Sequence, residues 1–280
     1  MIAVRKLMTL SPLHRARKAA QVLGHLEADY RQGRTIAGAW IAELGAAFAA
    51  DGSLSAELRA LAAEASSEAG KSALSSPEAG VRLINKLSRG LEAHAGLSPA
   101  DWDLREPLGS SLAVSERRVF PGLRAYLEDL RSPFNVGSIF RSADAFGFAE
   151  LLLSGFTADP AHPRAARSAM GAVEAVGWRR AGLEALEAER EAGGAVLALE
   201  LRGESVDGFA FPERGIVVVG SEELGVSPEA MALCTATVSI PMLGAKGSLN
   251  AGVAFGVLAN AWRSSLAVRG VEPVRYSANR

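Results

Sequence analysis

The sequence predicts a small all-α domain followed by an α/β domain, in which a mostly parallel sheet has helices on both faces. Two observations predict this order. Residues 1–100 contain only helical patterns, with frequent alanine and regularly spaced leucine, as is typical of a small helical bundle. Beyond residue 120, short apolar runs alternate with helical segments, as is typical of parallel strands joined by helices.

Four helices are expected in the N-terminal domain, which we place at residues 1–100. They cover residues 11–33, 35–52, 55–69 and 76–96. Ser11 and Pro12 open the first helix, because serine caps a helix and proline fits its first position, and Gly33 ends it. A cluster of proline, glycine and serine without periodicity follows, so we expect a linker over residues 101–120.

The α/β domain is expected over residues 121–268, with a C-terminal tail at 269–280. Its strands are expected at residues 124–130, 149–155, 195–201, 215–221 and 237–242, and its main helices at 132–147, within 162–178 and at 249–266. The strand segments are short apolar runs, the pattern of strands that are buried on both faces. Ligands bind such sheets beyond the carboxyl ends of the strands, so a functional site is expected in the loops there.

Composition and charge exclude several classes of protein. The formal net charge of −1 gives no strong overall field toward nucleic acid or membrane. Cys234 is the single cysteine, which excludes an internal disulfide and fits a reducing compartment. The 4 histidines are scattered, so no metal site is expected. Because no segment resembles a signal peptide or a membrane span, we expect a soluble cytoplasmic protein without membrane contact.

Basic residues cluster in the helical domain, and RNA binding is one hypothesis for it. The cluster contains Arg5, Lys6, Arg15, Arg17, Lys18, Arg82, Lys86 and Arg89, and further candidates are Arg117, Arg118, Arg164 and Arg167. Cations at helical spacing can follow a phosphate backbone. The alternative is an ordinary solvated helix face, which such a run forms more often.

Two familiar phosphate-binding motifs are absent. LGAKGSLN lacks the lysine followed directly by serine or threonine that a Walker loop requires, because Lys246 precedes Gly247. VVVGSEELG follows a predicted strand, yet its glycines Gly220 and Gly225 are five residues apart and form no G-x-G pair. These failures disfavour an enzyme that uses ATP, a nicotinamide or a flavin.

Three glycine-bearing loops remain, and each follows a predicted strand. In this order they resemble the three sequence motifs of the SpoU (TrmH-like) branch of the SPOUT RNA methyltransferases. The first, SPFNVGSIFRSADAFG, matches N-x-G/S-x-I-x-R-x-A-x-A-x-G at Asn135, Gly137, Ile139, Arg141, Ala143, Ala145 and Gly147. The second, VVVGSEELGVSPEAM, matches G-x-E-x-x-G at Gly220, Glu222 and Gly225. The third, VSIPMLGAKGSLNAGVAFG, matches I-P-M-x-G-x-x-x-S-L-N at Ile240, Pro241, Met242, Gly244, Ser248, Leu249 and Asn250.

The resemblance covers about residues 121–265 and implies a fold and an activity. The fold is an α/β domain whose C-terminal segment threads a trefoil knot, a rare exception to the rules of chain threading. The activity is methylation of a ribose 2′-hydroxyl in tRNA or rRNA by a homodimer that binds S-adenosylmethionine at the knot. By position, Gly220, Ile240 and Leu249 match residues that contact this cofactor, largely through main-chain groups. We expect Ile240, Met242 and Leu249 to wall the adenosyl group, with ordinary core packing as the alternative.

The expected catalytic set is Asn135, Arg141, Glu222, Ser248 and Asn250. The resemblance places Arg141 beside the ribose hydroxyl. Because guanidinium stays protonated and has no acceptor, we expect Arg141 to hold the adjacent phosphate and stabilise the developing alkoxide, while a phosphate or water takes the proton. Asn135 is expected to orient the ribose or support Arg141. Glu222 either orients the reacting groups or caps the following helix, and helix capping is also the alternative for Ser248 and Asn250.

One departure from the family pattern concerns the start of the last helix. Gly252 stands where the family commonly has a serine, so one hydroxyl near the expected site is missing. Our leading hypothesis is an S-adenosylmethionine-dependent RNA 2′-O-ribose methyltransferase. The alternative is a non-catalytic RNA-binding or assembly module that retains the fold.

Overall fold

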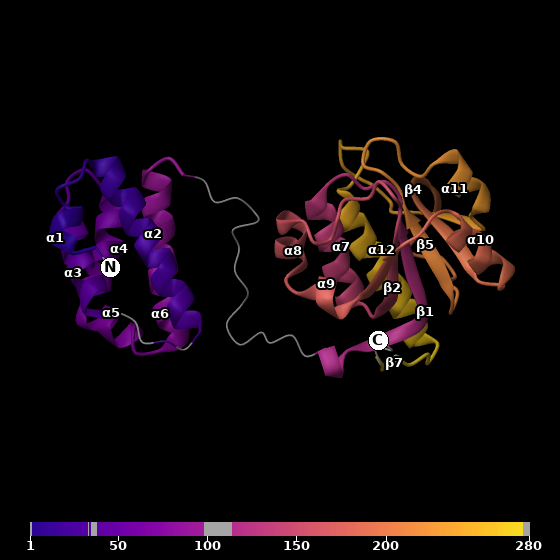
Figure 1. The fold of residues 1–280 in the computed structure, drawn as a ribbon, viewed down its shortest axis with the longest axis horizontal. Helices are drawn as coiled ribbons and strands as arrows, with labels where there is room; N and C mark the ends of the chain where they lie inside the picture. The colour runs from indigo at the N-terminus through magenta and orange to yellow at the C-terminus, as the bar shows by residue number, and fades with distance from the viewer. Residues whose placement is uncertain (1, 33, 35–37, 98–113, 277–280) are drawn as a thin grey trace. The chain divides into compact units, whose positions relative to one another are not determined.

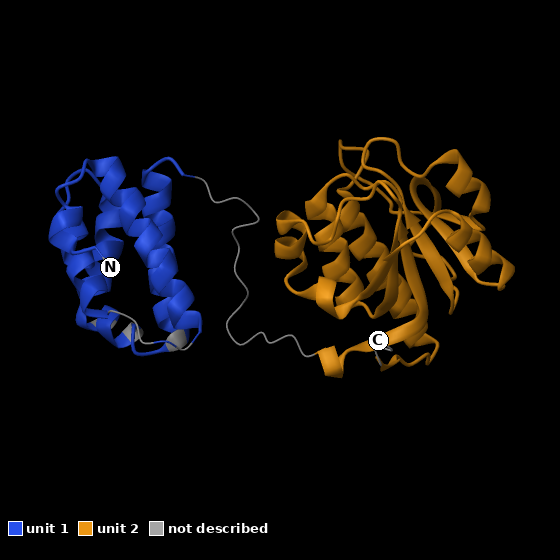
Figure 2. Cartoon of the chain, in the orientation of Figure 1, with its two compact units in different colours: residues 1–109 blue, residues 110–280 orange. Residues whose placement is uncertain are grey.

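The computed structural model describes residues 2–32, 34, 38–97 and 114–276. The chain divides into two compact units, residues 1–109 and 110–280 (Figure 2). Most of the predicted linker lies outside the described residues. Within the described part, no helix is long and apolar enough to cross a membrane.

The first unit is a helical bundle, as the sequence predicts (Figure 1). Its helices are α1 (Val4–Leu7), α2 (Pro12–Arg31), α3 (Gly38–Ala49), α4 (Ala56–Ser66), α5 (Glu68–Ala73) and α6 (Pro77–His94). The segment expected to form one helix over residues 55–69 is divided into α4 and α5. Ser67 causes the division, because it leaves the helical conformation and its hydroxyl accepts a hydrogen bond from the N–H of Gly70, which starts a new helix.

The second unit contains a seven-stranded sheet with the order β3-β2-β1-β5-β4-β6, and β7 pairs with β1. The strands are β1 (Arg118–Leu127), β2 (Phe148–Leu153), β3 (Gly177–Arg180), β4 (Ala195–Ser205), β5 (Gly215–Val219), β6 (Ala236–Ser239) and β7 (Val274–Arg275). All pairs are parallel except β1 with β7. Threading of the chain through a knot stays a prediction.

Helices cover both faces of this sheet (Figure 1). They are α7 (Pro133–Ala145), α8 (Pro163–Ala169), α9 (Ala172–Ala175), α10 (Glu184–Glu191), α11 (Pro228–Leu233) and α12 (Ala251–Val268). Alternate residues of β5 serve the two cores: Val217 and Val219 pack on the face that includes α7 and α12, whereas Ile216 and Val218 pack on the face of α10 and α11. Burial of both faces explains why these strands read as continuous apolar runs.

The α/β unit extends beyond both of its expected ends. β1 begins at Arg118, within the stretch assigned to the linker, and β7 lies in the segment assigned to the tail. Pro121 and Gly122 conceal the start of β1, because both residues are disfavoured within strands. The pairing of β1 with β2 shifts register between Phe120 and Arg124, and this irregularity accommodates them.

Candidate functional site

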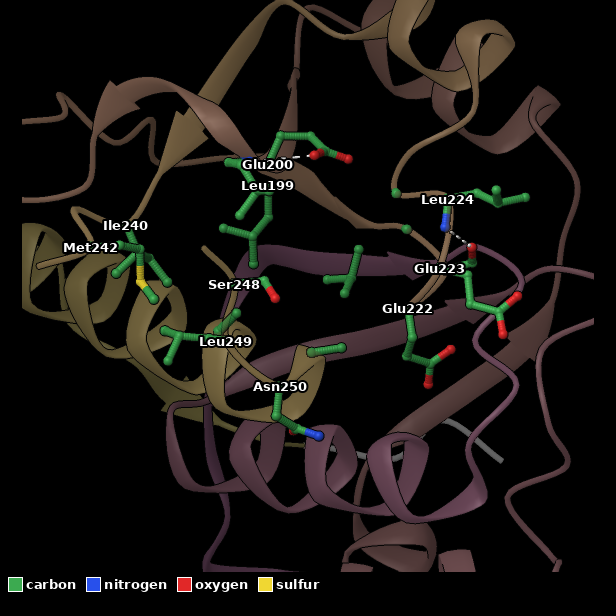
Figure 3. Close-up of a pocket in the computed structure, with 17 residues that line it drawn as sticks. Leu199, Glu200, Glu222, Glu223, Leu224, Ile240, Met242, Ser248, Leu249 and Asn250 are labelled. Atoms are coloured by element: carbon green, nitrogen blue, oxygen red, sulfur yellow. Dashed lines mark hydrogen bonds between the residues drawn. The ribbon is translucent and has the colours of Figure 1, made fainter. Parts of the chain in front are cut away.

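The second and third loops line one pocket beyond the carboxyl ends of β5 and β6 and beside the middle of β4 (Figure 3). The pocket has a volume of ≈ 560 Å³, which is within the usual range for small-molecule sites. Of the residues predicted to act, seven line it: Gly220, Glu222, Ile240, Met242, Ser248, Leu249 and Asn250. The two loops therefore share one pocket, and the roles assigned to their residues stay predictions.

The apolar wall of the pocket comes from three different segments. Ile240, Met242 and Leu249 gather at one side, and Leu199, the last residue of β4 that pairs with β5, adds a fourth apolar side chain (Figure 3). The backbone of Gly220 also lines the pocket, as do the acidic residues Glu222 and Glu223. Apolar walls next to main-chain polar groups fit a ligand with flat apolar faces and polar edges, such as a nucleoside.

The turn after β5 is held tightly by its own backbone and by one carboxylate. Ser221 and Gly225 exchange two backbone hydrogen bonds, of 3.1 and 2.9 Å, and Gly225 has a φ of +70° that favours glycine. Glu200, in the middle of β4, accepts a hydrogen bond of 2.7 Å from the N–H of Val226. A side chain on Gly220 would overlap the backbone of Gly225 and Val226, so this turn requires glycine there.

Glu222 binds the loop that leads into α7, rather than the helix that follows Glu222 in the sequence. Its carboxylate accepts hydrogen bonds from the N–H groups of Arg131 and Ser132, at 3.1 and 3.2 Å, and from the side-chain amide of Asn135, at 2.7 Å. Burial favours the neutral acid, but these hydrogen bonds favour the anion, and the net effect lowers the pKa of Glu222 below its ordinary value. Glu222 is therefore a fixed anion at neutral pH.

Asn135 connects Glu222 to the third loop. It is buried, with 4% of its surface exposed, and its Oδ1 accepts a hydrogen bond of 2.8 Å from Nδ2 of Asn250. Oδ1 of Asn250 accepts from the N–H groups of Gly252 and Val253, so Asn250 also caps α12. Glu222, Asn135 and Asn250 thus form a continuous hydrogen-bonded chain through all three loops, which we call the Asn–Glu relay. The capping alternative for Asn250 is confirmed.

The helices behind the relay pack at close range. An added Cβ on Gly252 would lie 2.9 Å from Oγ and 3.0 Å from Cβ of Ser138 on α7, and one on Gly256 would lie 3.4 Å from Oγ of Ser142. The space of the serine that the family pattern leads one to expect at position 252 is therefore taken up by Ser138. The sequence signals only a missing hydroxyl, whereas the structure places another hydroxyl beside the same position.

Arg141 lies outside the pocket of its own chain. It is exposed on α7, and within the part of the chain that the structure describes its guanidinium makes no hydrogen bond or ion pair. Asn135 likewise does not support it, because the amide of Asn135 is used by Glu222 and Asn250. The structure therefore leaves Arg141 available to a molecule outside this chain.

Sequence reasoning missed Glu200 and Leu199, which line the pocket from β4. Both residues belong to the apolar run 195–201, which predicts a buried strand, so neither was expected at the site. The signal that points to Glu200 is a charged residue near the end of the apolar run 195–201, and the pairing of β4 with β5 ends just before it, at Leu199.

The basic residues proposed to bind RNA differ in exposure and in ion pairing. Arg117 is a wrong candidate, because it is 7% exposed and binds Asp144 and the carbonyl of Phe148. In the helical unit, Arg15 is paired with Asp51 and Arg89 with Glu92. The exposed members of that set include Arg5, Lys6, Arg17, Lys18, Arg82 and Lys86.

Comparison with known proteins gives a family match for residues 122–260, to the SpoU rRNA Methylase family. The 23S rRNA (uridine(2479)-2′-O)-methyltransferase of Streptomyces viridochromogenes is 37% identical over 128 residues, which are 43% of this chain and 45% of that protein. A protein of Mycobacterium sp. strain KMS, named uncharacterized tRNA/rRNA methyltransferase, is 33% identical over 177 residues, which are 62% of this chain and 55% of that protein. The chain spans about half the length of these relatives.

Two solved structures are also similar. The SpoU methyltransferase AviRb from Streptomyces viridochromogenes, in complex with the cofactor AdoMet, is 34% identical with a TM-score of 0.47, and the match covers 52% of this chain and 61% of that one. An rRNA methyltransferase from Sinorhizobium meliloti is 29% identical with a TM-score of 0.48, over 54% of this chain and 58% of that one.

Proposed function

This chain belongs to the SpoU rRNA methylase family, and we propose that it transfers a methyl group from S-adenosylmethionine to a ribose 2′-hydroxyl of tRNA or rRNA. The observation that carries the proposal is the Asn–Glu relay, which ties the three motif loops together around one nucleoside-sized pocket. A pocket assembled from three such distant segments is a preorganised binding site, and positioning is a large part of catalysis in group transfer.

The residues that line the pocket would hold the cofactor there. Leu199, Ile240, Met242 and Leu249 would enclose the adenosyl group, and main-chain groups at Gly220 would contact it. The cofactor supplies an electrophilic methyl group on a positively charged sulfur. Glu222 stays ionised beside the pocket and favours positive charge there. We assign Glu222 and Asn135 to positioning, because their polar atoms are used to hold the loops.

On the substrate side, Arg141 binds the phosphate next to the modified ribose. A guanidinium holds a phosphate with two parallel N–H donors and stabilises the negative charge that develops as the hydroxyl loses its proton. A phosphate oxygen or water takes that proton, since Arg141 has no acceptor. Ser248 lines the pocket, and we assign its hydroxyl to orienting the ribose. Asn250 also lines the pocket, and we assign it to positioning, because its amide holds Asn135 and the start of α12.

The protein works as a homodimer in this proposal. Phe134 on α7 and Leu249, Val253 and Val257 at α12 are exposed around the helix pair, and we call this the α7–α12 surface. Arg141 lies on α7 three residues beyond Ser138, the residue that contacts α12, so it lies beside this surface. A second copy seated there covers apolar side chains and receives Arg141 from its neighbour, which accounts for the distance of Arg141 from its own pocket.

Substitution by a charged residue tests whether the α7–α12 surface forms the dimer contact. Val253→Glu places a carboxylate in the centre of the α7–α12 surface, and the variant is expected to run as a monomer in light scattering. Val268→Glu is the matched control, because Val268 is an exposed valine at the far end of α12. A dimeric Val253→Glu variant would contradict the α7–α12 surface as the contact, and a monomeric wild type would contradict the dimer.

The proposal also assigns a role to the helical unit and places the protein in the cytoplasm. Exposed cations on α2 and α6, Arg17, Lys18, Arg82 and Lys86, give the helical unit a surface that attracts phosphates, and we assign it to capture of the RNA in the cytoplasm. The second candidate, a non-catalytic RNA-binding module, is favoured by one observation only, the absence of Arg141 from the pocket of its own chain.

The experiment that tests the activity uses methyl-labelled S-adenosylmethionine and total RNA from cells that lack this gene. Wild type is expected to label the RNA. Arg141→Ala is expected to bind the cofactor normally and to lose about 10²–10³-fold in turnover, the usual loss on removing one donor to a developing oxyanion. Full turnover in Arg141→Ala would contradict its role, and cofactor binding without labelling of any RNA would favour the non-catalytic module.

A further inference from the structure

Phe156 is the most exposed aromatic side chain in the described part of the chain, with 85% of its surface in solvent. It lies in the loop between β2 and α8, three residues beyond the carboxyl end of β2. Exposure of one apolar side chain is ordinary by itself. The loop that presents Phe156, however, is held in place by several hydrogen bonds.

Buried side chains on both sides of Phe156 fix the loop to the end of β1. Ser154 donates to Oδ1 of Asp129 at 2.6 Å and accepts from the N–H of Asp129 at 2.9 Å. Thr157 donates to the carbonyl of Leu127 at 2.7 Å. Arg180 donates to the carbonyls of both Ser154 and Thr157, each at 2.6 Å. The phenyl ring therefore stands on a rigid base, which reduces the entropy lost when something stacks on it.

The same loop is continuous with the proposed catalytic site. The N–H of Ala158 donates to the carbonyl of Leu130, and the next two residues, Arg131 and Ser132, are those whose N–H groups bind Glu222. In the sheet, β2 lies two strands from β5, which leads to Glu222. With a strand spacing of about 4.8 Å, Phe156 is on the order of 10 Å along the sheet edge from that loop. This is the distance of a neighbouring nucleotide rather than of the reacting one.

We propose that Phe156 is a stacking platform for an unpaired base of the substrate RNA, one that flanks the modified nucleotide. The proposal rests on the RNA methyltransferase function proposed above and deepens it. Proteins recognise RNA at unpaired nucleotides whose bases stack on aromatic side chains, and a rigid, exposed ring supplies such a face. The loop continues into α8, which presents Arg164 and Arg167 at the surface, a side of the molecule that suits a phosphate backbone.

Kinetics of variants test the proposal, with unmodified 16S and 23S rRNA transcripts and unmodified tRNA transcripts as substrates. Phe156→Ala is expected to raise the KM for RNA by a factor of about 5 to 150, since a stacked base contributes about 1–3 kcal/mol. The affinity for S-adenosylmethionine and kcat at saturating RNA are expected to stay unchanged. Phe156→Trp is expected to keep the wild-type KM, because it retains an aromatic face, whereas Phe156→Leu is expected to behave as Phe156→Ala.

A control variant and a second readout separate the possible outcomes. Val268→Ala removes another highly exposed apolar side chain, at the end of α12, and is expected to leave the KM unchanged. In Phe156→Trp, added RNA is expected to quench emission more than in wild type. An unchanged KM in Phe156→Ala, or a change of oligomeric state in that variant, would overturn the stacking role. Absence of methyl transfer by wild type would instead contradict the proposed function itself.

Discussion

Asn250 donates a hydrogen bond of 2.8 Å to Asn135, a residue 115 positions earlier in the chain. The two asparagines belong to different motif loops, and each also makes a second contact: Asn135 with Glu222, and Asn250 with the first N–H groups of α12. The relation explains why amides are required at both positions. Each residue donates to one partner and accepts from another, which a carboxylate cannot do at neutral pH because it only accepts.

Asn135→Asp tests the direction of these hydrogen bonds. The new carboxylate can still accept from Asn250, but it faces the carboxylate of Glu222 without a proton between them. We expect a loss of about 1–3 kcal/mol in the free energy of unfolding at pH 7, as for a buried polar contact that is left unsatisfied. Part of the loss is expected to be recovered at low pH, where the two carboxyls share a proton. Denaturant unfolding at pH 7 and pH 4.5 measures both values, and a loss that does not depend on pH would contradict the arrangement.

Glu222→Gln tests the anion. Because the folded state lowers the pKa of Glu222, its contribution to stability is complete above the ordinary pKa of 4.5 and is lost as the pH falls through the lower folded value. The variant is therefore expected to be less stable than wild type at pH 7, with a difference that shrinks on acidification. Glu223→Gln is the control, since Glu223 makes an exposed ion pair with Arg131. A constant difference between wild type and Glu222→Gln from pH 7 to pH 3 would show that Glu222 is not a stabilised anion.

Gly220→Ala tests the turn that lines the pocket. The added Cβ would overlap the backbone of Gly225 and Val226, which are fixed by hydrogen bonds and cannot move cheaply. We expect a destabilisation of about 1–3 kcal/mol and a loss of affinity for S-adenosylmethionine. Gly244→Ala is the matched control, because nothing lies within 4 Å of its added Cβ. Calorimetric titration of both variants decides, and equal affinities would refute the requirement for glycine at position 220.

Gly252→Ala and Ser138→Gly together test the packing of α7 against α12. The first substitution alone brings a Cβ to 2.9 Å from Oγ of Ser138 and is expected to cost about 1–3 kcal/mol of stability. In the Ser138→Gly background the same substitution is expected to cost much less, because its obstacle has gone. The coupling free energy from the double-mutant cycle measures this contact, and strict additivity would mean that the two side chains do not compete for space.

The sequence was sufficient for the α/β architecture and for the two motif loops of the pocket, because these depend on local patterns, but not for the short strands β3 and β7. Apolar runs predicted the buried strands, and the three motif loops predicted seven of the residues that line the pocket. The start of β1 was not predicted, because strands usually exclude residues such as Pro121 and Gly122. A register shift accommodates both residues there.

Contacts between distant loops lay beyond the sequence. Asn135 was expected to serve the ribose or Arg141, but it serves Glu222 and Asn250. Glu222 was considered as a cap for the helix that follows it, whereas it binds the loop before α7. These contacts share one cause: the order of strands in the sheet decides which side chains meet, and it places β1 beside β5. The roles of Asn135 and Glu222 toward the substrate stay predictions.

The central claim is that this chain methylates a ribose 2′-hydroxyl, and identification of the product nucleoside tests it most directly. Wild-type protein is incubated with methyl-labelled S-adenosylmethionine and RNA that lacks the modification, and the RNA is digested to nucleosides and analysed by mass spectrometry. The account predicts a labelled 2′-O-methylated nucleoside that is absent when Arg141→Ala is used. A labelled nucleoside with the methyl group on its base would contradict the account.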